Sequence, residues 1–137
     1  MNVSIEWHSD LRFTGRNERG QLIEIDATEI EGEAKGVTPM QLLLVTLGGC
    51  TAIDVVNILH KQRQTLTGLT VNLSGERRKD PPRYFEKIHI EYMLTGHELE
   101  KSKVERAIML SQQKYCSVEA MLKGVAAITA SYKILKK

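Results

Sequence analysis

The 137-residue chain is poor in cysteine and lacks the common cofactor motifs. Its two cysteines, Cys50 and Cys116, are 66 positions apart, which excludes a local metal-binding pattern such as CxxC. There is no Walker motif and no GxGxxG, and the zinc-protease motif that His97 and Glu98 begin has Lys101 where its second histidine would stand. The other histidines have no spacing typical of metal ligands. We therefore expect no metal and no cofactor.

The chain also lacks an excess of charge and a long apolar run. A net charge of +2 does not favour a nucleic-acid or membrane partner. One basic cluster, from Arg77 to Arg83, has no interleaved aromatic residues and is interpreted as a solvated hairpin loop. The N-terminus is not signal-like, and no stretch reaches the roughly 18 consecutive apolar residues of a membrane span. We therefore expect a cytoplasmic protein without nucleic-acid or membrane partners.

Apolar and polar residues alternate in several short segments. This pattern predicts strands near 2–8, 11–17, 20–26, 69–74, 88–94 and 126–134. Helical spacing predicts an amphipathic helix over 98–114, and a short helix capped by Ser117 and closed by a left-handed Gly124. The strands at 69–74 and 88–94 are expected to form an antiparallel hairpin. This order predicts one α+β domain, residues 1–137, with an antiparallel sheet that wraps helices.

The most informative stretch is a predicted helix from Thr38 to Arg63, with Gly48 and Gly49 directly before Cys50. Thr38 suits the N-cap of this helix. The first half of the helix is apolar on every side, and such a helix must be surrounded by protein. One small sheet and one amphipathic helix cannot cover it. We therefore expect a homodimer in which two copies of the helix pack together.

Cys50 and Cys116 are the candidate reactive groups. A buried free cysteine usually behaves as a small core residue, and that interpretation of Cys50 stays open. Cys116 lies beside the predicted helix N-terminus, with Lys114 two residues before it, and both features favour a thiolate. In the cytoplasm a permanent disulfide is not expected, but a transient one is chemically reasonable. The two cysteines are therefore either a redox couple or unrelated core residues.

Two segments of the chain resemble the motifs of the OsmC/Ohr superfamily, which contains osmotically inducible and organic-hydroperoxide-resistance proteins. They are TPMQLLLVTLGGCTAID around Cys50 and YCSVEAML around Cys116. The resemblance covers essentially the whole chain and is greatest to the OsmC-like branch. It implies an intertwined homodimer with an antiparallel sheet wrapped around a long central helix. It also implies that Cys50 attacks an organic hydroperoxide, that Cys116 closes a disulfide with it, and that a dithiol such as a lipoyl group reduces the pair.

The resemblance further implies an arginine from the N-terminal strands. Arg12 and Arg16 are both candidates, and Arg12 is favoured because it follows the bend after the first strand. A guanidinium beside a thiol favours the thiolate and offers several donors to peroxide oxygens. The hydroperoxide reductases place a Glu after the helix-starting proline to pair with this arginine, whereas this chain has Met40. We expect an acid of the preceding loop to substitute for it, namely Glu29, Glu31 or Glu33.

The leading hypothesis is thiol-dependent reduction of organic hydroperoxides in oxidative-stress defence. The leucine-rich stretch 42–47 would suit an alkyl or lipid hydroperoxide, although the same residues would serve equally well as core. Two alternatives stay open. One is a non-enzymatic dimer that binds a hydrophobic small molecule, and the other is a thiol redox sensor that reports oxidation through a Cys50–Cys116 disulfide.

Overall fold

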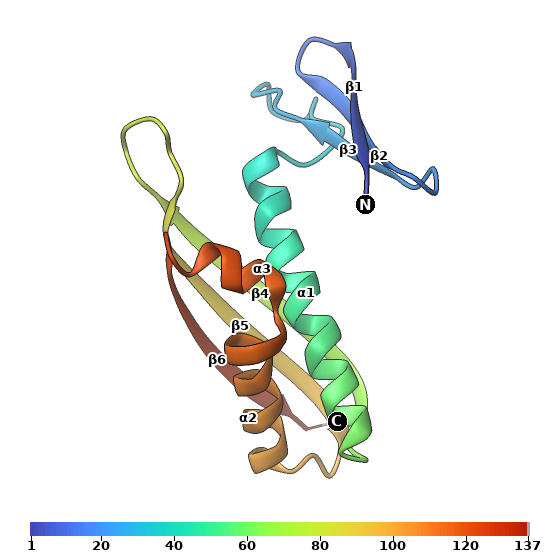
Figure 1. Ribbon diagram of the computed structural model, residues 1–137, viewed down its shortest axis with the longest axis vertical. Helices are drawn as coiled ribbons and strands as arrows, with labels where there is room; N and C mark the ends of the chain where they lie inside the picture. The colour runs from blue at the N-terminus through green and yellow to red at the C-terminus, as the bar shows by residue number, and fades with distance from the viewer. Residues whose placement is uncertain (137) are drawn as a thin grey trace. The chain divides into compact units, whose positions relative to one another are not determined.

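The computed structural model describes residues 1–136. It divides within the long helix into two compact units, Met1–Leu43 and a second unit that begins at Leu44. The order of elements along the chain is the predicted one, and the α+β class is confirmed. Figure 1 gives the labels of the helices and strands used below.

The first unit contains the three predicted N-terminal strands, β1 (Val3–Ser9), β2 (Arg12–Asn17) and β3 (Leu22–Asp26). They form an antiparallel sheet in the order β1-β2-β3. The chain then returns alongside β3, where the Asp26 backbone N–H donates to the Val37 carbonyl oxygen at 3.0 Å. A Cβ on Gly36 would lie 2.4 Å from the carbonyl oxygen of Glu24, so this close approach requires glycine. The return holds the backbone of residues 35–37 beside the end of β3.

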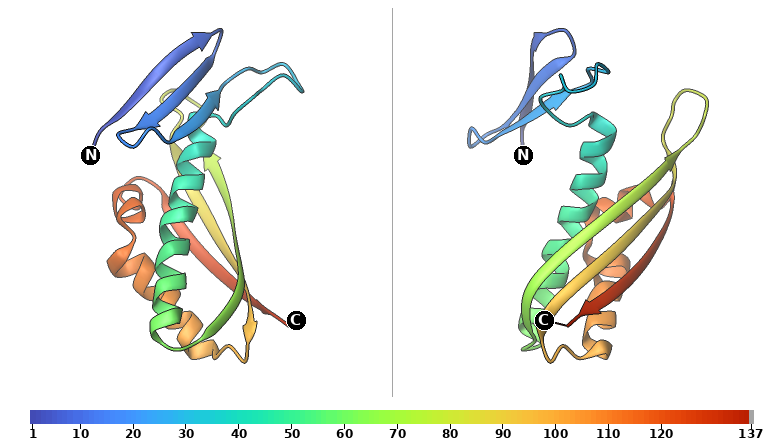
Figure 2. Two further views of the ribbon diagram at one scale, coloured as in Figure 1. Left: turned by 90° about the vertical axis from the view of Figure 1, so that its right-hand side faces the viewer. Right: turned by 180° about the vertical axis from the view of Figure 1, so that it is seen from behind.

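The second unit contains a sheet of three strands, β4 (Thr65–Arg77), β5 (Phe85–His97) and β6 (Ala127–Leu135), in the order β4-β5-β6. The predicted hairpin between β4 and β5 is antiparallel, as expected, whereas β6 pairs parallel to β5. Both long helices of the unit lie on one face of this sheet (Figures 1 and 2). The buried residues of β5 are Phe85 and, in alternation after a register shift, Ile88, Ile90, Tyr92 and Leu94.

Helix α1 (Pro39–Lys61) begins with the predicted cap. The Gln41 backbone N–H donates to Thr38 Oγ1 at 3.2 Å, and Gln41 Oε1 accepts from the Thr38 backbone N–H at 3.0 Å. Its buried residues recur at helical spacing and form one stripe: Leu47, Gly48, Thr51, Val55 and Leu59. By length and composition α1 could cross a membrane, but this stripe identifies it as the core helix of the fold.

The two glycines of α1 have different surroundings. A Cβ on Gly48 would lie 2.6 Å from Leu73 Cδ1, so the absence of a side chain lets the helix approach β4 closely. A Cβ on Gly49 would meet nothing within 4 Å. The apolar residues Val45, Ile53 and Val56 on other sides of α1 are 44–63% exposed in the single chain. Helix α1 therefore carries apolar side chains in both of its halves that the single chain leaves exposed.

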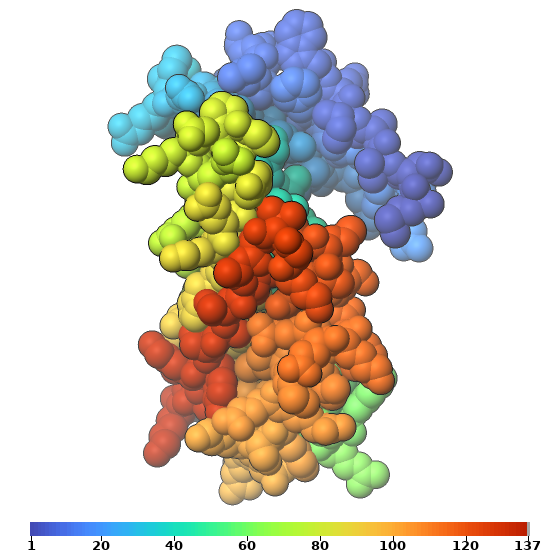
Figure 3. All heavy atoms as spheres, turned by 60° about the vertical axis from the view of Figure 1, so that its left-hand side comes forward, coloured from blue at the N-terminus to red at the C-terminus, as the bar shows by residue number. Residues whose placement is uncertain are grey.

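The predicted helix over 98–114 is shorter than expected. Helix α2 (Lys101–Leu110) is followed by a π-helical turn, η1 (Ser111–Tyr115), and then by α3 (Ser117–Leu122). Figure 3 shows this segment as a continuous layer of atoms on the outside of the second unit. The predicted left-handed Gly124 is wrong, because Gly20 and Gly32 are the glycines with positive φ among residues 1–136. Instead, the C-cap of α3 is Lys123, which has a right-handed helical conformation.

Candidate active site

The structure brings Cys50 and Cys116 together within the second unit. Cys50 lies in α1 directly before the buried Thr51 and is partly exposed, whereas Cys116 is 2% exposed. Both are free thiols. A hydrogen bond between the two side chains is one of the causes that raise the pKa of Cys116. The two sequence candidates are therefore neighbours, in the reduced state.

The local structure around Cys116 differs from the prediction in two ways. The N-cap of α3 is Cys116 and not Ser117, and its Sγ accepts from the Glu119 backbone N–H at 3.4 Å. The predicted thiolate is also wrong, because the pKa of Cys116 is raised from 9.0 to about 12. Burial is the largest cause, and the contacts with Cys50 and Glu119's charge add to it, while the Glu119 N–H opposes it. A six-residue helix does not offset the loss of solvation.

Glu119 is a residue of this site that the sequence did not predict. It is 4% exposed, and burial raises its pKa, while the charge of Lys123 and a hydrogen bond from Gln112 lower it. Its Oε2 has no hydrogen-bond partner among the described residues 1–136. The sequence signal that could have found it is its place three residues after the capping position, as in a capping box.

A buried chain of hydroxyl groups joins α1, β5 and η1 beside the thiols. Thr51 Oγ1 lies 2.7 Å from both the Tyr92 hydroxyl and Ser111 Oγ, and Ser111 Oγ donates to Asp54 Oδ2 at 2.9 Å. The Cys116 backbone N–H donates to the Ser111 carbonyl oxygen at 2.8 Å. The π-helical turn is thus anchored at Ser111, which fixes the backbone of Cys116 relative to α1. Turns of this type often occur at functional sites.

Burial raises the pKa of Tyr92 to about 12, and the negative charges of Glu119 and Cys116 contribute. Glu119 therefore acts on both Tyr92 and Cys116. Thr51, Tyr92, Ser111, Cys116 and Glu119 form one buried polar cluster, which we call the thiol cluster together with Cys50.

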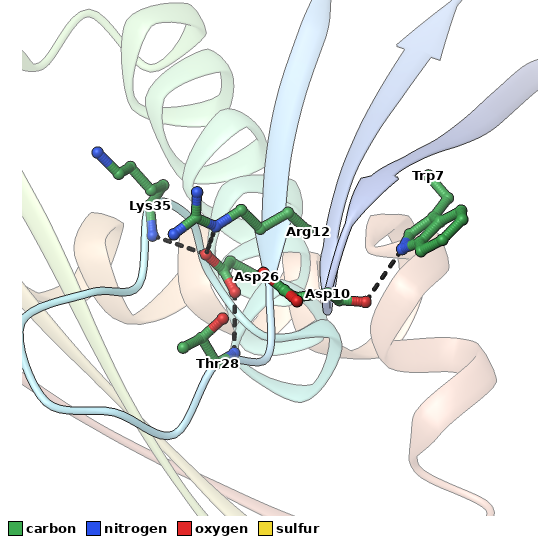
Figure 4. A network of polar contacts seen from close by, with 6 residues as sticks. All are labelled: Trp7, Asp10, Arg12, Asp26, Thr28 and Lys35. Carbon is green, nitrogen blue, oxygen red and sulfur yellow. Dashed lines mark hydrogen bonds and ion pairs between the residues drawn. The ribbon is translucent and has the colours of Figure 1, made fainter.

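Arg12 belongs to a separate polar cluster in the first unit (Figure 4). Its Nε lies 3.4 Å from Oδ2 of Asp26, which is 2% exposed. Asp26 also accepts from the Thr28 backbone N–H at 2.8 Å and from the Lys35 backbone N–H at 3.0 Å. The pKa of Asp26 is lowered from 3.8 to about 2 by hydrogen bonds from Thr28 and Lys35 and, more weakly, by the charge of Arg12. A permanent carboxylate therefore holds the guanidinium of Arg12.

This finding corrects the expected substitute for the missing Glu at Met40. The carboxylate partner of Arg12 is Asp26, at the end of β3, while the three loop acids are exposed: Glu29, Glu31 and Glu33. Arg16, the other candidate arginine, is exposed on β2. It borders an apolar depression of about 310 Å³ in the first unit. Of the two arginines, Arg12 is therefore the one with a fixed charge partner.

No group of three or more histidine, cysteine or acidic residues that could hold a metal ion occurs among residues 1–136.

Comparison with known proteins places this arrangement in a family. Residues 32–131 match the family described as OsmC-like protein. Protein YhfA of Escherichia coli K12 is 39% identical over 135 residues, 98% of each chain. A hypothetical protein from Aquifex aeolicus has a crystal structure with a TM-score of 0.88, 34% identity and coverage of 99% of this chain and 96% of its own.

The likeness extends more weakly to structures of lower sequence identity. The organic hydroperoxide resistance protein OhrB of Bacillus subtilis has a TM-score of 0.65 at 13% identity, with 96% of each chain covered, which shows a shared fold. The predicted membership is confirmed by the family match and by the relatives that align over nearly the full length. The chain belongs to the OsmC-like family.

Proposed function

We propose that this protein reduces organic hydroperoxides with Cys50 and Cys116 as a thiol pair, in oxidative-stress defence. The observation that carries the proposal is the contact of two free thiols, one partly exposed and one buried, in a polar cluster of an OsmC-like fold. Family neighbours include organic hydroperoxide resistance proteins. Accessibility divides the roles, because the partly exposed Cys50 can meet a substrate that the buried Cys116 cannot.

In the proposed reaction the Cys50 thiolate attacks the distal oxygen of the hydroperoxide. The O–O bond breaks, the alkoxide takes a proton and leaves as an alcohol, and Cys50 becomes a sulfenic acid. The Cys116 thiol then attacks the sulfur of Cys50, the S–O bond breaks, and water leaves as the disulfide forms. A dithiol of the lipoyl type reduces the disulfide by two exchange steps and becomes a cyclic disulfide.

Arg12 is the arginine proposed to favour the Cys50 thiolate, with Arg16 as the alternative. Asp26 supports this choice, because it provides the carboxylate partner that Met40 cannot. An arginine held in one orientation presents its donors without a further loss of side-chain entropy. The missing family Glu therefore does not leave Arg12 without an anchor.

We also propose that the protein works as a cytoplasmic homodimer in which residues 1–137 act as one OsmC-like domain. The support for association is the apolar surface of α1, where Val45, Ile53 and Val56 remain exposed in the single chain. A patch of this kind on a core helix is typical of a surface that a partner covers. Light scattering at low micromolar concentration tests the proposed dimer. A stable folded monomer, with half the mass of the dimer, would contradict it.

Turnover of an alkyl hydroperoxide in the presence of dihydrolipoamide tests the enzymatic proposal. Cys50→Ser should abolish turnover, because a serine hydroxyl is not ionised at neutral pH. Cys116→Ser should permit one turnover and leave Cys50 oxidised. Arg12→Ala should slow the first step, whereas Arg19→Ala, in an exposed turn, is the matched control and should not. Arg16→Ala decides between the two candidate arginines.

The wild-type protein decides between the enzyme and its alternatives. Absence of dithiol-dependent turnover with both alkyl and lipid hydroperoxides would overturn the enzymatic proposal. A hydrophobic ligand that co-purifies with the protein would then favour the binding function. A Cys50–Cys116 disulfide that forms without turnover would favour the redox sensor.

A further inference from the structure

Glu119 is a buried carboxyl group that the proposed reaction does not yet use. Its side chain is 4% exposed, and Oε2 has no hydrogen-bond partner within the described part of the chain. Acidic residues are rarely buried in this way unless they are paired, and a buried unsatisfied polar atom calls for an explanation. If this position served only the fold, an alanine there would avoid the free-energy cost of burying a carboxyl group.

The position of Glu119 relates it to the reacting sulfur. It lies one turn after Cys116 in α3, and its backbone N–H contacts Cys116 Sγ at 3.4 Å. The negative charge of Glu119 raises the pKa values of Cys116 and Tyr92. Burial raises the pKa of Glu119 itself, and two neighbours lower it, namely Lys123 through its charge and Gln112 of η1 through a hydrogen bond. The carboxyl group therefore belongs to the same buried cluster as the resolving thiol.

The chemistry of Cys116 requires a proton acceptor. The nucleophile in disulfide formation is the thiolate and not the thiol. With a pKa of about 12, Cys116 is a neutral thiol at physiological pH. It must lose its proton as it attacks Cys50. Bulk water cannot readily accept this proton, because Cys116 is only 2% exposed.

We infer that Glu119 is the general base that takes the proton from Cys116 Sγ when Cys116 attacks oxidised Cys50. The S–S bond forms as the S–O bond of the Cys50 sulfenic acid breaks, and Glu119 passes the proton to the departing hydroxide, which leaves as water. The Cys116 sulfur is oxidised and the Cys50 sulfur is reduced, so protons and electrons balance. This inference rests on the proposed function, since it assigns a role within the same two-thiol site. The free lone pairs of Oε2 accept the proton.

The raised pKa of Glu119 suits it to this step. A stronger base captures the proton of a weakly acidic thiol more effectively than an ordinary carboxylate does. The same carboxylate also repels a Cys116 thiolate, which is one of the reasons for the high pKa of Cys116. A purely electrostatic role and a proton-accepting role therefore predict opposite effects when the carboxylate is removed.

The test uses an oxidant that bypasses the hydroperoxide. Reduced protein is treated with limiting 5,5′-dithiobis(2-nitrobenzoate), which converts the accessible Cys50 to a mixed disulfide and releases one thionitrobenzoate. Attack by Cys116 then releases a second one, and its rate is followed by absorbance between pH 6 and pH 9. Cys116→Ser, which should stop the second release, verifies the assignment. Failure of peroxidase activity leaves this measurement intact, so the two proposals fail separately.

We expect Glu119→Gln to slow the second release at pH 7 by about tenfold or more, because general-base catalysis contributes at least that much. The wild-type rate should be nearly level across this pH range, whereas the variant rate should rise about tenfold per pH unit as hydroxide replaces the base. Glu86→Gln, at an exposed position of β5, is the matched control and should behave as the wild type.

Glu119→Asp keeps the carboxyl group and protects the test against misfolding of the amide variant. It should retain the shallow pH dependence. A Glu119→Gln variant that releases the second thionitrobenzoate as fast as the wild type, or faster, would overturn the inference. A wild-type rate that itself rises tenfold per pH unit, or a wild type without a second release, would overturn it as well.

Discussion

Two carboxyl groups are buried among the described residues, Asp26 in the first unit and Glu119 in the second, and their pKa values are shifted in opposite directions. Asp26 accepts two backbone N–H groups and faces the guanidinium of Arg12, which lowers its pKa to about 2. Glu119 has Gln112 and the charge of Lys123, which do not outweigh its burial. Hydrogen bonds are the largest cause of the shift at Asp26, whereas burial is the largest cause at Glu119.

The difference teaches what each carboxyl group can do. A carboxylate with a full set of donors stays charged throughout the physiological range and suits the fixing of a cation in place. A carboxyl group with an unpaired oxygen and a raised pKa exchanges a proton more readily near neutral pH. Asp26 is thus suited to hold Arg12, and Glu119 to move a proton beside the thiols.

The largest loss of stability should come from removing the Asp26 carboxylate in the first unit. Asp26→Ala leaves the backbone N–H groups of Thr28 and Lys35 without an acceptor and removes the ion-pair partner of Arg12. We expect the melting temperature to fall by on the order of 10 °C. Thermal unfolding followed by circular dichroism measures it. Asp80→Ala, in an exposed loop, is the control, and equal melting of the two variants would contradict the role of Asp26.

The acid sensitivity of the protein should carry the signature of Asp26. Because the folded-state pKa of about 2 lies below 3.8, the stabilisation is fully present above about pH 4 and is lost as the pH falls through about 2. Asp26→Asn should therefore be less stable than the wild type at pH 5, and the two should converge towards pH 2. Urea denaturation at several pH values tests this. A stability difference that does not change with pH would show that charge plays no part.

A smaller effect is expected in the hydroxyl network beside Glu119. Tyr92→Phe removes one of the two partners of Thr51 Oγ1, while Ser111 remains. We expect a loss of about 1 kcal/mol, because a buried hydrogen bond contributes about that amount. Urea denaturation midpoints compare it with Tyr115→Phe, at a side chain that is 50% exposed. An equal loss in both variants would show that the network does not stabilise the thiol cluster.

The sequence predicted the elements of the fold well, because alternation and helical spacing report which side of each element is buried. The sequence could not predict that β6 pairs parallel to β5, because the alternation of apolar and polar residues is the same in parallel and antiparallel strands. The π-helical turn at Ser111–Tyr115 was missed because its residues continue a helical pattern. The hairpin of β4 and β5 was predicted correctly because its two strands are adjacent along the chain.

The candidate site divides in the same way. Cys50 and Cys116 were found because reactive residue types in a resembling motif can be read directly. The role of Asp26 was missed because its hydrogen-bond donors are backbone N–H groups, which only the folded loop brings to the carboxylate. The side chains of the sequence do not indicate such donors. Glu119 was missed because an acid in the first turn of a helix is ordinary. What made each acid notable was burial, which depends on the packing of distant segments.

The smallest expected effect is a gain in stability from Glu119→Gln. Because the folded-state pKa of Glu119 lies above 4.5, ionisation opposes folding as the pH rises from 4.5 through that value, and the penalty is absent below it. The amide cannot ionise, so any cost of burying it is the same at every pH. The stability of Glu119→Gln relative to the wild type should therefore increase as the pH rises from 4 to 8.

Urea denaturation midpoints at pH 4 and pH 8 measure this difference, and Glu86→Gln is the exposed control. A constant difference between Glu119→Gln and the wild type would mean that Glu119 is no harder to ionise in the folded protein than in the unfolded chain, and the contrast between the two buried carboxyl groups would then be lost.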